Sequence, residues 1–254
     1  MTAFRDYASA PPQVVALYKT NHEKQTLDYV LQTKERLKDG FGKRLGIWKV
    51  LEMLDSLVDE SDPDTESAQT QHALQSAEKA RRDKQPRWMV LACLIHDLGK
   101  MLCLHGFEQW SVVGDTFPVG IKHSEKIVFS EFFSENPDSR NPKLNSKLGI
   151  YSEGCGLANV HMSYGHDEYL YNVVKDYVPQ EMAYVIRFHS FYAWHKEGAY
   201  QELLDDTDRR MLPHLLAFNK YDLYSKSEAL VDVESVRDYY TELINEFFPA
   251  EIVF

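Results

Sequence analysis

Four histidines and two aspartates lie where an apolar pattern would place them inside this chain. In LACLIHDLGKMLC (91–103), His96 and Asp97 interrupt an apolar run, and Lys100 follows one helical turn later. Burying ionisable groups without partners costs several kcal/mol, so partners must come from elsewhere in the chain. The remaining members of this set are His72, His166, His189 and Asp222.

Most of these side chains share a helical face with apolar residues. His189 follows Val185 and Ile186 on such a face, and Asp222 follows Phe218. A lone histidine on an apolar face is usually a hydrogen-bonded core residue. Several inward-facing positions in one chain favour a metal site instead, because imidazole and carboxylate suit iron, manganese or zinc.

An adjacent His-Asp pair is suited to two metals, because the carboxylate can bridge two cations while the imidazole binds one. The four imidazoles, Asp222 and a bridging Asp97 would supply about seven of the roughly twelve bonds that two six-coordinate cations need. Open positions are typical of reactive rather than structural sites. Surface or ordinary hydrogen-bonding roles are expected for His22, His105, His123, His161, His195 and His214.

The composition excludes several classes of protein. The 254 residues carry a net charge of −11, which argues against binding to nucleic acid or anionic lipid. The longest apolar run, 88–95, is too short to span a bilayer, and the N-terminus has no signal-peptide core. Three cysteines without a C-x-x-C motif indicate reduced thiols. We therefore expect a cytoplasmic protein with no membrane or nucleic-acid partner. Nothing in the sequence requires an oligomer, so we expect a monomer.

Helical periodicity dominates the chain and predicts an all-α fold in a single domain over 1–254. The segment 110–120 is β-branched and punctuated by glycine, which fits either a short hairpin or a shaped loop. Helices are expected over 47–58, from an Asp62-Pro63 start through His72, over 87–98, from Pro179 to about His195, over 213–224 and over 232–248.

Six segments together closely resemble the myo-inositol oxygenase family of the HD-domain superfamily. They are LVDESDPD (57–64), LIHDLGK (94–100), QWSVVGDTFPVG (109–120), SYGHDEYLY (163–171), IRFHSFYAWH (186–195) and FNKYDLYSK (218–226). The pattern H…HD…H…H…D alone does not choose a reaction, because binuclear phosphodiesterases of that superfamily carry similar ligands. An HD-type metal-dependent phosphohydrolase and a catalytically silent binding module are the alternatives, and the full ligand set argues against the second.

The resemblance implies a single HD-domain-like helical bundle with short β-hairpin elements around a mixed-valent di-iron centre. Its implied reaction, in inositol catabolism, converts myo-inositol and O2 into D-glucuronate and water by cleaving a ring C–C bond. It implies His72, His96, Asp97 and Asp222 at one iron, which takes dioxygen. Asp97, His166 and His189 would hold the other iron, which takes two adjacent oxygens of myo-inositol. The residues that it places around the substrate are Arg5, Asp59, Glu60, Ser61, Lys100, Gly114, Asp115, His189 and Ser190.

Two of those side chains favour a polyol over a phosphate ester on chemical grounds. Asp59 and Asp115 accept hydrogen bonds from hydroxyl groups, provided that their loops line the site. A phosphate ester would be repelled by them and would need more arginine or lysine. Lys100 is either a snorkelling lysine at a helix end or, near the metals, a cation that stabilises a substrate alkoxide.

Overall fold

The computed structural model describes residues 7–61, 68–224 and 229–254. The predicted substrate residue Arg5 and the predicted helix start at Asp62-Pro63 lie outside the described residues.

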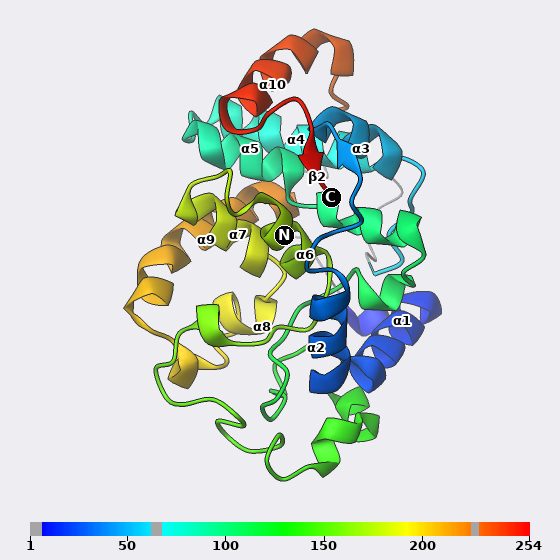
Figure 1. Cartoon of the computed structure of the whole chain (residues 1–254), viewed down its shortest axis with the longest axis vertical. Helices are drawn as coiled ribbons and strands as arrows, with labels where there is room; N and C mark the ends of the chain where they lie inside the picture. The colour runs from blue at the N-terminus through cyan, green and yellow to red at the C-terminus, as the bar shows by residue number, and fades with distance from the viewer. Residues whose placement is uncertain (1–6, 62–67, 225–228) are drawn as a thin grey trace.

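The fold is mainly helical, as the sequence predicts (Figure 1). Ten α-helices occur in the described part of the chain, joined by short 3₁₀ helices and irregular loops. The α-helices are α1 (Pro12–Lys24), α2 (Leu27–Arg36), α3 (Ile47–Leu54), α4 (Gln69–Arg82), α5 (Arg87–Ile95), α6 (His166–Val174), α7 (Gln180–Phe188), α8 (Tyr192–His195), α9 (Asp206–Tyr224) and α10 (Val233–Phe247). The 3₁₀ helix η2 (Leu98–His105) follows α5.

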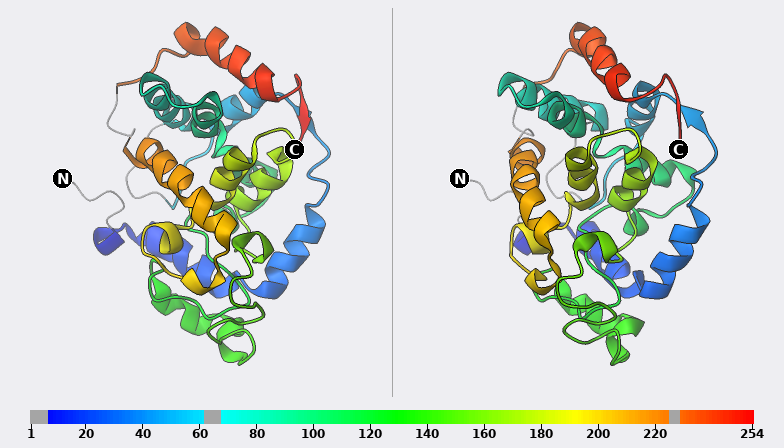
Figure 2. Two further views of the ribbon diagram at one scale, coloured as in Figure 1. Left: turned by 90° about the vertical axis from the view of Figure 1, so that its left-hand side faces the viewer. Right: turned by 60° about the vertical axis from the view of Figure 1, so that its left-hand side comes forward.

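A bundle of five helices forms the centre of the molecule (Figure 2). α4 packs along α5 and α6 packs along α7, while α9 lies against α4, α5 and α7. The buried side chains form one continuous hydrophobic cluster from α1 to the C-terminal strand. The single domain expected from the sequence stays a prediction, and this continuous core supports it.

Four predicted helices differ from those in the structure. The helix predicted over 47–58 ends at Leu54. The predicted helix 87–98 ends at Ile95, and the one from Pro179 ends at Phe188, so both break next to a candidate ligand. The helix predicted to start at residue 213 begins at Asp206 instead, with Pro213 inside it. Pro213 lacks a backbone N–H, yet the packing of α9 against α4 and α7 is sufficient to keep the helix continuous.

The only strands in the described residues form no hairpin. β1 (Arg44–Leu45) pairs antiparallel with β2 (Ile252–Val253), which joins the C-terminal residues to the segment between α2 and α3. The segment 110–120 is a shaped loop after a short 3₁₀ turn, with a single bridge from Pro118 to Met162.

One described stretch, Arg87–His105, is long and apolar enough to pass as a membrane span by length and composition. It runs through α5 and η2, and 72% of its most apolar window is buried inside the protein. This burial is what a core helix of the bundle would show.

Candidate metal centre

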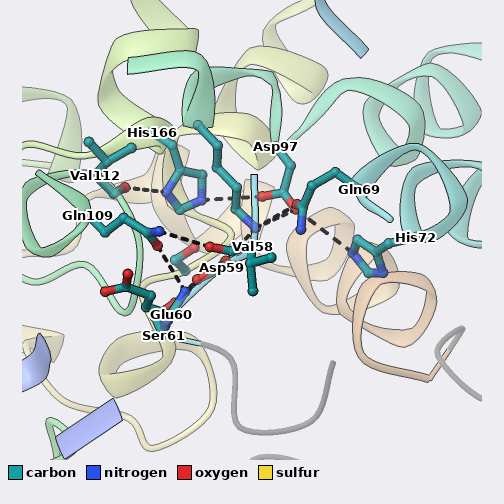
Figure 3. Close-up of polar contacts among 12 residues, drawn as sticks. Val58, Asp59, Glu60, Ser61, Gln69, His72, Asp97, Gln109, Val112 and His166 are labelled. Carbon is teal, nitrogen blue, oxygen red and sulfur yellow. Dashed lines mark hydrogen bonds and ion pairs between the residues drawn. The ribbon is translucent and has the colours of Figure 1, made fainter. Parts of the chain in front are cut away.

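The two oxygens of Asp97 face His166 on one side and His72 on the other (Figure 3). Oδ2 lies 3.4 Å from His96 Nε2 and 4.0 Å from His72 Nε2. Oδ1 lies 3.5 Å from His166 Nε2 on the other side. The ligand atoms of His72, His96 and Asp97 lie within 4.8 Å of one another, as do those of Asp97, His166 and His189. The carboxylate therefore lies where a bridge between two cations would lie.

Asp222 of α9 completes the first group. Its Oδ1 lies 3.1 Å from His72 Nε2 and 3.3 Å from His96 Nε2. The hydroxyl of Tyr192 donates to the other oxygen of Asp222 at 3.4 Å, which orients the carboxylate. We call His72, His96, Asp97 and Asp222 the first metal position, and Asp97, His166 and His189 the second.

Two of the imidazoles are oriented by the ends of their own helices. α5 and α7 stop just before His96 and His189, so carbonyls in their last turns lack intrahelical partners. His96 Nδ1 donates to the carbonyl of Cys93 at 3.0 Å, and His189 Nδ1 donates to that of Ile186 at 2.9 Å. Since a carbonyl only accepts, each Nδ1 carries the proton and each Nε2 faces the cluster.

His166 is oriented by the loop that precedes it, because its Nδ1 donates to the carbonyl of Val112 at 2.7 Å. Its Nε2 then lies 3.2 Å from His189 Nε2. In the neutral rings both of these nitrogens present lone pairs, and a cation between them would satisfy both.

The spacing of the donor atoms fits six-coordinate cations. Ligand atoms at right angles, about 2.1 Å from a common centre, lie about 3 Å apart. Three separations at the first position, 3.1–3.4 Å, and those of 3.2–3.5 Å at the second are close to that value. His72 Nε2 and Asp97 Oδ2, at 4.0 Å, lie farther apart. Imidazole and carboxylate donors are suited to iron, manganese or zinc.

The charges of the cluster are strongly coupled. Burial acts to lower the pKa of His96, but Asp97 and Asp222 overcome it and raise that pKa to about 10. Burial acts to raise the pKa of Asp97, but His96 and Lys100 hold it well below its ordinary value. A cation at the first position would therefore replace a proton, and its binding would release that proton.

Gly99 allows the two halves of the site to approach each other. A Cβ at this position would lie 2.1 Å from the backbone oxygen of His166. Only glycine therefore lets η2, which follows Asp97, pack directly against the start of α6.

Lys100 joins the metal cluster to a predicted substrate loop. Its Nζ donates to Asp97 Oδ2 at 2.9 Å and to Asp59 Oδ2 at 2.7 Å, with Gln69 Oε1 at 3.4 Å. Asp59 also accepts the backbone N–H and the hydroxyl of Ser61, at 2.8 and 2.6 Å. Lys100, Asp59 and Ser61 are all buried, and the carboxylates raise the pKa of Lys100 in spite of its burial. Lys100 is therefore a charged interior residue rather than a snorkelling one.

The loop carrying Gly114 and Asp115 also reaches the cluster. The N–H of Thr116 donates to the carbonyl of Ser190, next to His189, at 3.0 Å. Asp115 is buried and accepts the hydroxyl of Tyr18 at 3.0 Å. Gly114 has a φ of +96°, which favours glycine.

Among the described residues that are predicted to contact the substrate, Glu60 is the least favourably placed. Its side chain is exposed, and its backbone N–H donates to Gln109 Oε1 at 2.9 Å. Gln109 also donates to the carbonyl of Val58 at 2.8 Å and so holds this loop in place (Figure 3).

Sequence reasoning missed Asp167, Tyr18 and Gln69. Asp167 forms a second His-Asp pair with His166, and the attention given to the pair at 96–97 could have been extended to it. Tyr18 and Gln69 lie in segments without any pattern typical of a site, so only the folded chain shows where they reach.

Helices that converge on two adjoining groups of imidazole and carboxylate ligands define a candidate two-cation site within a helical bundle. A family model described as myo-inositol oxygenase matches residues 12–254. The chain belongs to the myo-inositol oxygenase family.

Named relatives agree with this assignment. The chain is 48% identical over 260 residues to a probable inositol oxygenase of Oryza sativa subsp. japonica, covering 98% of this chain and 84% of that protein. It is 48% identical over 258 residues to the inositol oxygenase of Bos taurus, covering 98% and 90%. It is 44% identical over 259 residues to that of Dictyostelium discoideum, covering 98% and 89%.

Proposed function

We propose that this protein is an inositol oxygenase that converts myo-inositol and O2 into D-glucuronate and water. The atoms balance, since the equivalent of one oxygen atom of O2 enters the uronic acid as the ring opens, and the equivalent of the other leaves with two hydrogens as water. The observation that carries the proposal is the division of the two Asp97 oxygens between two histidine groups. It occurs in a chain whose matched family and named relatives are inositol oxygenases.

We propose two iron ions as the cofactor, in a mixed-valent Fe(II)/Fe(III) pair of an HD-type site. His72, His96, Asp97 and Asp222 would hold one, and Asp97, His166 and His189 the other. When bound, the irons supply O2 activation and the electron transfer that ring cleavage requires. The protein holds their ligands in place through backbone carbonyls, which fix the three Nε2 atoms of His96, His166 and His189 toward the cluster.

Lys100 is the residue that we assign to the reacting oxygen. It carries a positive charge in the interior and lies 2.9 Å from Asp97, beside both metal positions. A buried cation there stabilises negative charge on a substrate hydroxyl as its proton leaves. Asp59 holds Lys100 in this orientation from the other side.

The rim of the site favours a neutral polyol. Asp59, Asp115 and Ser190 are buried and offer oxygen atoms that accept hydrogen bonds from hydroxyl groups. Two carboxylates would repel a phosphate ester, so this rim favours the oxygenase over a phosphohydrolase. The matched family and the named relatives favour the same choice, because they are oxygenases by name.

The test is oxygen uptake by the protein loaded with ferrous iron, with a thiol reductant and myo-inositol in air-saturated buffer. We expect equal amounts of O2 consumed and glucuronate formed, and neither in a His96→Ala variant. Absence of uptake with iron fully bound, together with hydrolysis of phosphate esters in manganese, would replace the proposal by the phosphohydrolase.

A further inference from the structure

A third buried carboxylate lies beside the second metal position. Asp167 is the second residue of α6 and its side chain is only 1% exposed. Its Oδ1 lies 2.7 Å from His166 Nε2 and 3.6 Å from His189 Nε2, the two ring atoms that face the cluster. The carboxylate therefore faces the same space as the second metal position.

Asp167 also holds Ser190. The backbone N–H of Ser190 donates to Asp167 Oδ2 and its hydroxyl donates to Oδ1, both at 3.2 Å. Ser190 follows His189 directly, at the point where α7 has ended. One side chain thus connects both imidazoles of the second position to a predicted substrate contact.

The balance of charge gives Asp167 a role. The first metal position has Asp222 for itself and shares Asp97. The second position, with two neutral imidazoles, would have only its share of the Asp97 charge. Lys100 reduces the net charge of that carboxylate further, since its Nζ lies 2.9 Å from Asp97 Oδ2. A buried cation needs nearby compensation, because a low-dielectric interior does not screen it.

We propose that Asp167 is a positioning and charge-balancing residue of the second metal position, where it strengthens cation binding and holds the Ser190 hydroxyl toward the substrate. The inference rests on the proposed two-metal function. Neighbouring groups of this kind change metal affinity about 10- to 100-fold when they are removed.

The experiment is a titration of the metal-free protein with Mn(II), in which electron paramagnetic resonance monitors the bound ions. Two adjacent Mn(II) ions give an exchange-coupled signal, and a single ion gives an isolated six-line signal. In Asp167→Asn, which keeps the shape of the side chain, we expect the second affinity to fall about 10- to 100-fold while the first stays within threefold. The matched control is Asp176→Asn, which removes an exposed carboxylate just beyond α6 and should behave as the unmodified protein.

Equal second affinity in Asp167→Asn and the unmodified protein would overturn the inference while leaving the proposed function intact. An unmodified protein that binds one Mn(II) or none would instead overturn the two-metal centre itself. If Asp167→Asn does not fold, Ser190→Ala is the test, because it removes the hydroxyl that donates to Asp167 Oδ1 and so loosens the orientation of that carboxylate. We then expect a severalfold loss of second affinity and a raised KM for myo-inositol, and no change in either would refute the inference.

Discussion

Replacement of Glu168 by glutamine should destabilise the fold more than any surface substitution. Glu168 is buried and accepts from Arg187 Nε at 2.7 Å, from Arg187 Nη2 at 3.2 Å and from Lys34 Nζ at 2.8 Å. Breaking a buried ion pair from one side typically costs about 3–5 kcal/mol, because the remaining charge is left unpaired. Lys34 is 23% exposed and can reach water, and Arg187 keeps the carbonyls of Ala158 and Val160 at 3.4 Å. We therefore expect a loss of about 3 kcal/mol for Glu168→Gln.

The assay is urea unfolding of Glu168→Gln, Arg187→Met and the double variant. We expect each single variant to be less stable than the double variant, because the double variant leaves no buried arginine or glutamate unpaired. The surface control is Glu23→Gln in the exposed pair with Lys19, where the change should be below about 0.5 kcal/mol. A loss below about 1 kcal/mol in Glu168→Gln would refute the reasoning.

The pairing of Glu168 with Arg187 and Lys34 also makes the stability of the fold depend on pH. Burial acts to raise the pKa of Glu168, but Arg187 and Lys34 overcome it and lower that pKa below its ordinary value. The stability that Glu168 contributes is therefore present above the ordinary glutamate pKa and lost as the pH falls through the lowered one. The difference between the unmodified protein and Glu168→Gln should shrink in acid.

Burial lowers the pKa of His123 to about 4, so the unfolded chain takes up a proton there between pH 7 and pH 5 and the folded chain does not. From pH 7 to pH 5, the unfolding free energy of the unmodified protein should therefore fall by about 2 kcal/mol more than that of the His123→Phe variant, as urea titrations would measure. An equal fall in the two proteins would contradict this. Gly99→Ala should displace the backbone of His166 and so weaken binding of the second cation, as Mn(II) titration would show, and unchanged affinity would contradict the packing. Lys100→Met should lower kcat for glucuronate formation at least about tenfold with iron still bound, and an unchanged kcat would exclude the assigned role.

Most of the proposed metal ligands could be predicted from the sequence because they lie on or next to a helix with apolar neighbours. His72 is the exception, since its neighbours on α4 are mainly alanine and polar residues. Phe218 and Leu215 are fully buried beside Asp222, as periodicity indicates. The breaks at His96 and His189 could not be predicted, because the apolar pattern continues through them. The end of α7 depends on a tertiary contact, since the N–H of Ser190 bonds Asp167 of another helix instead of continuing α7.

The sequence predicts a surface or ordinary hydrogen-bonding role for His195, and its ring bonds the carbonyl of His189 at 3.0 Å and Asn219 at 3.0 Å. It thereby supports the break that presents a ligand. Contacts of this kind depend on how α8 and α9 pack, which no local pattern in the sequence contains.

The proposed function depends on two cations that share Asp97. Anomalous X-ray scattering at the iron edge, from crystals of the iron-loaded protein, tests it most directly. We expect two peaks on opposite sides of Asp97, one beside His72, His96 and Asp222 and the other beside His166 and His189. A single peak, or a pair in which Asp97 contacts only one ion, would contradict it.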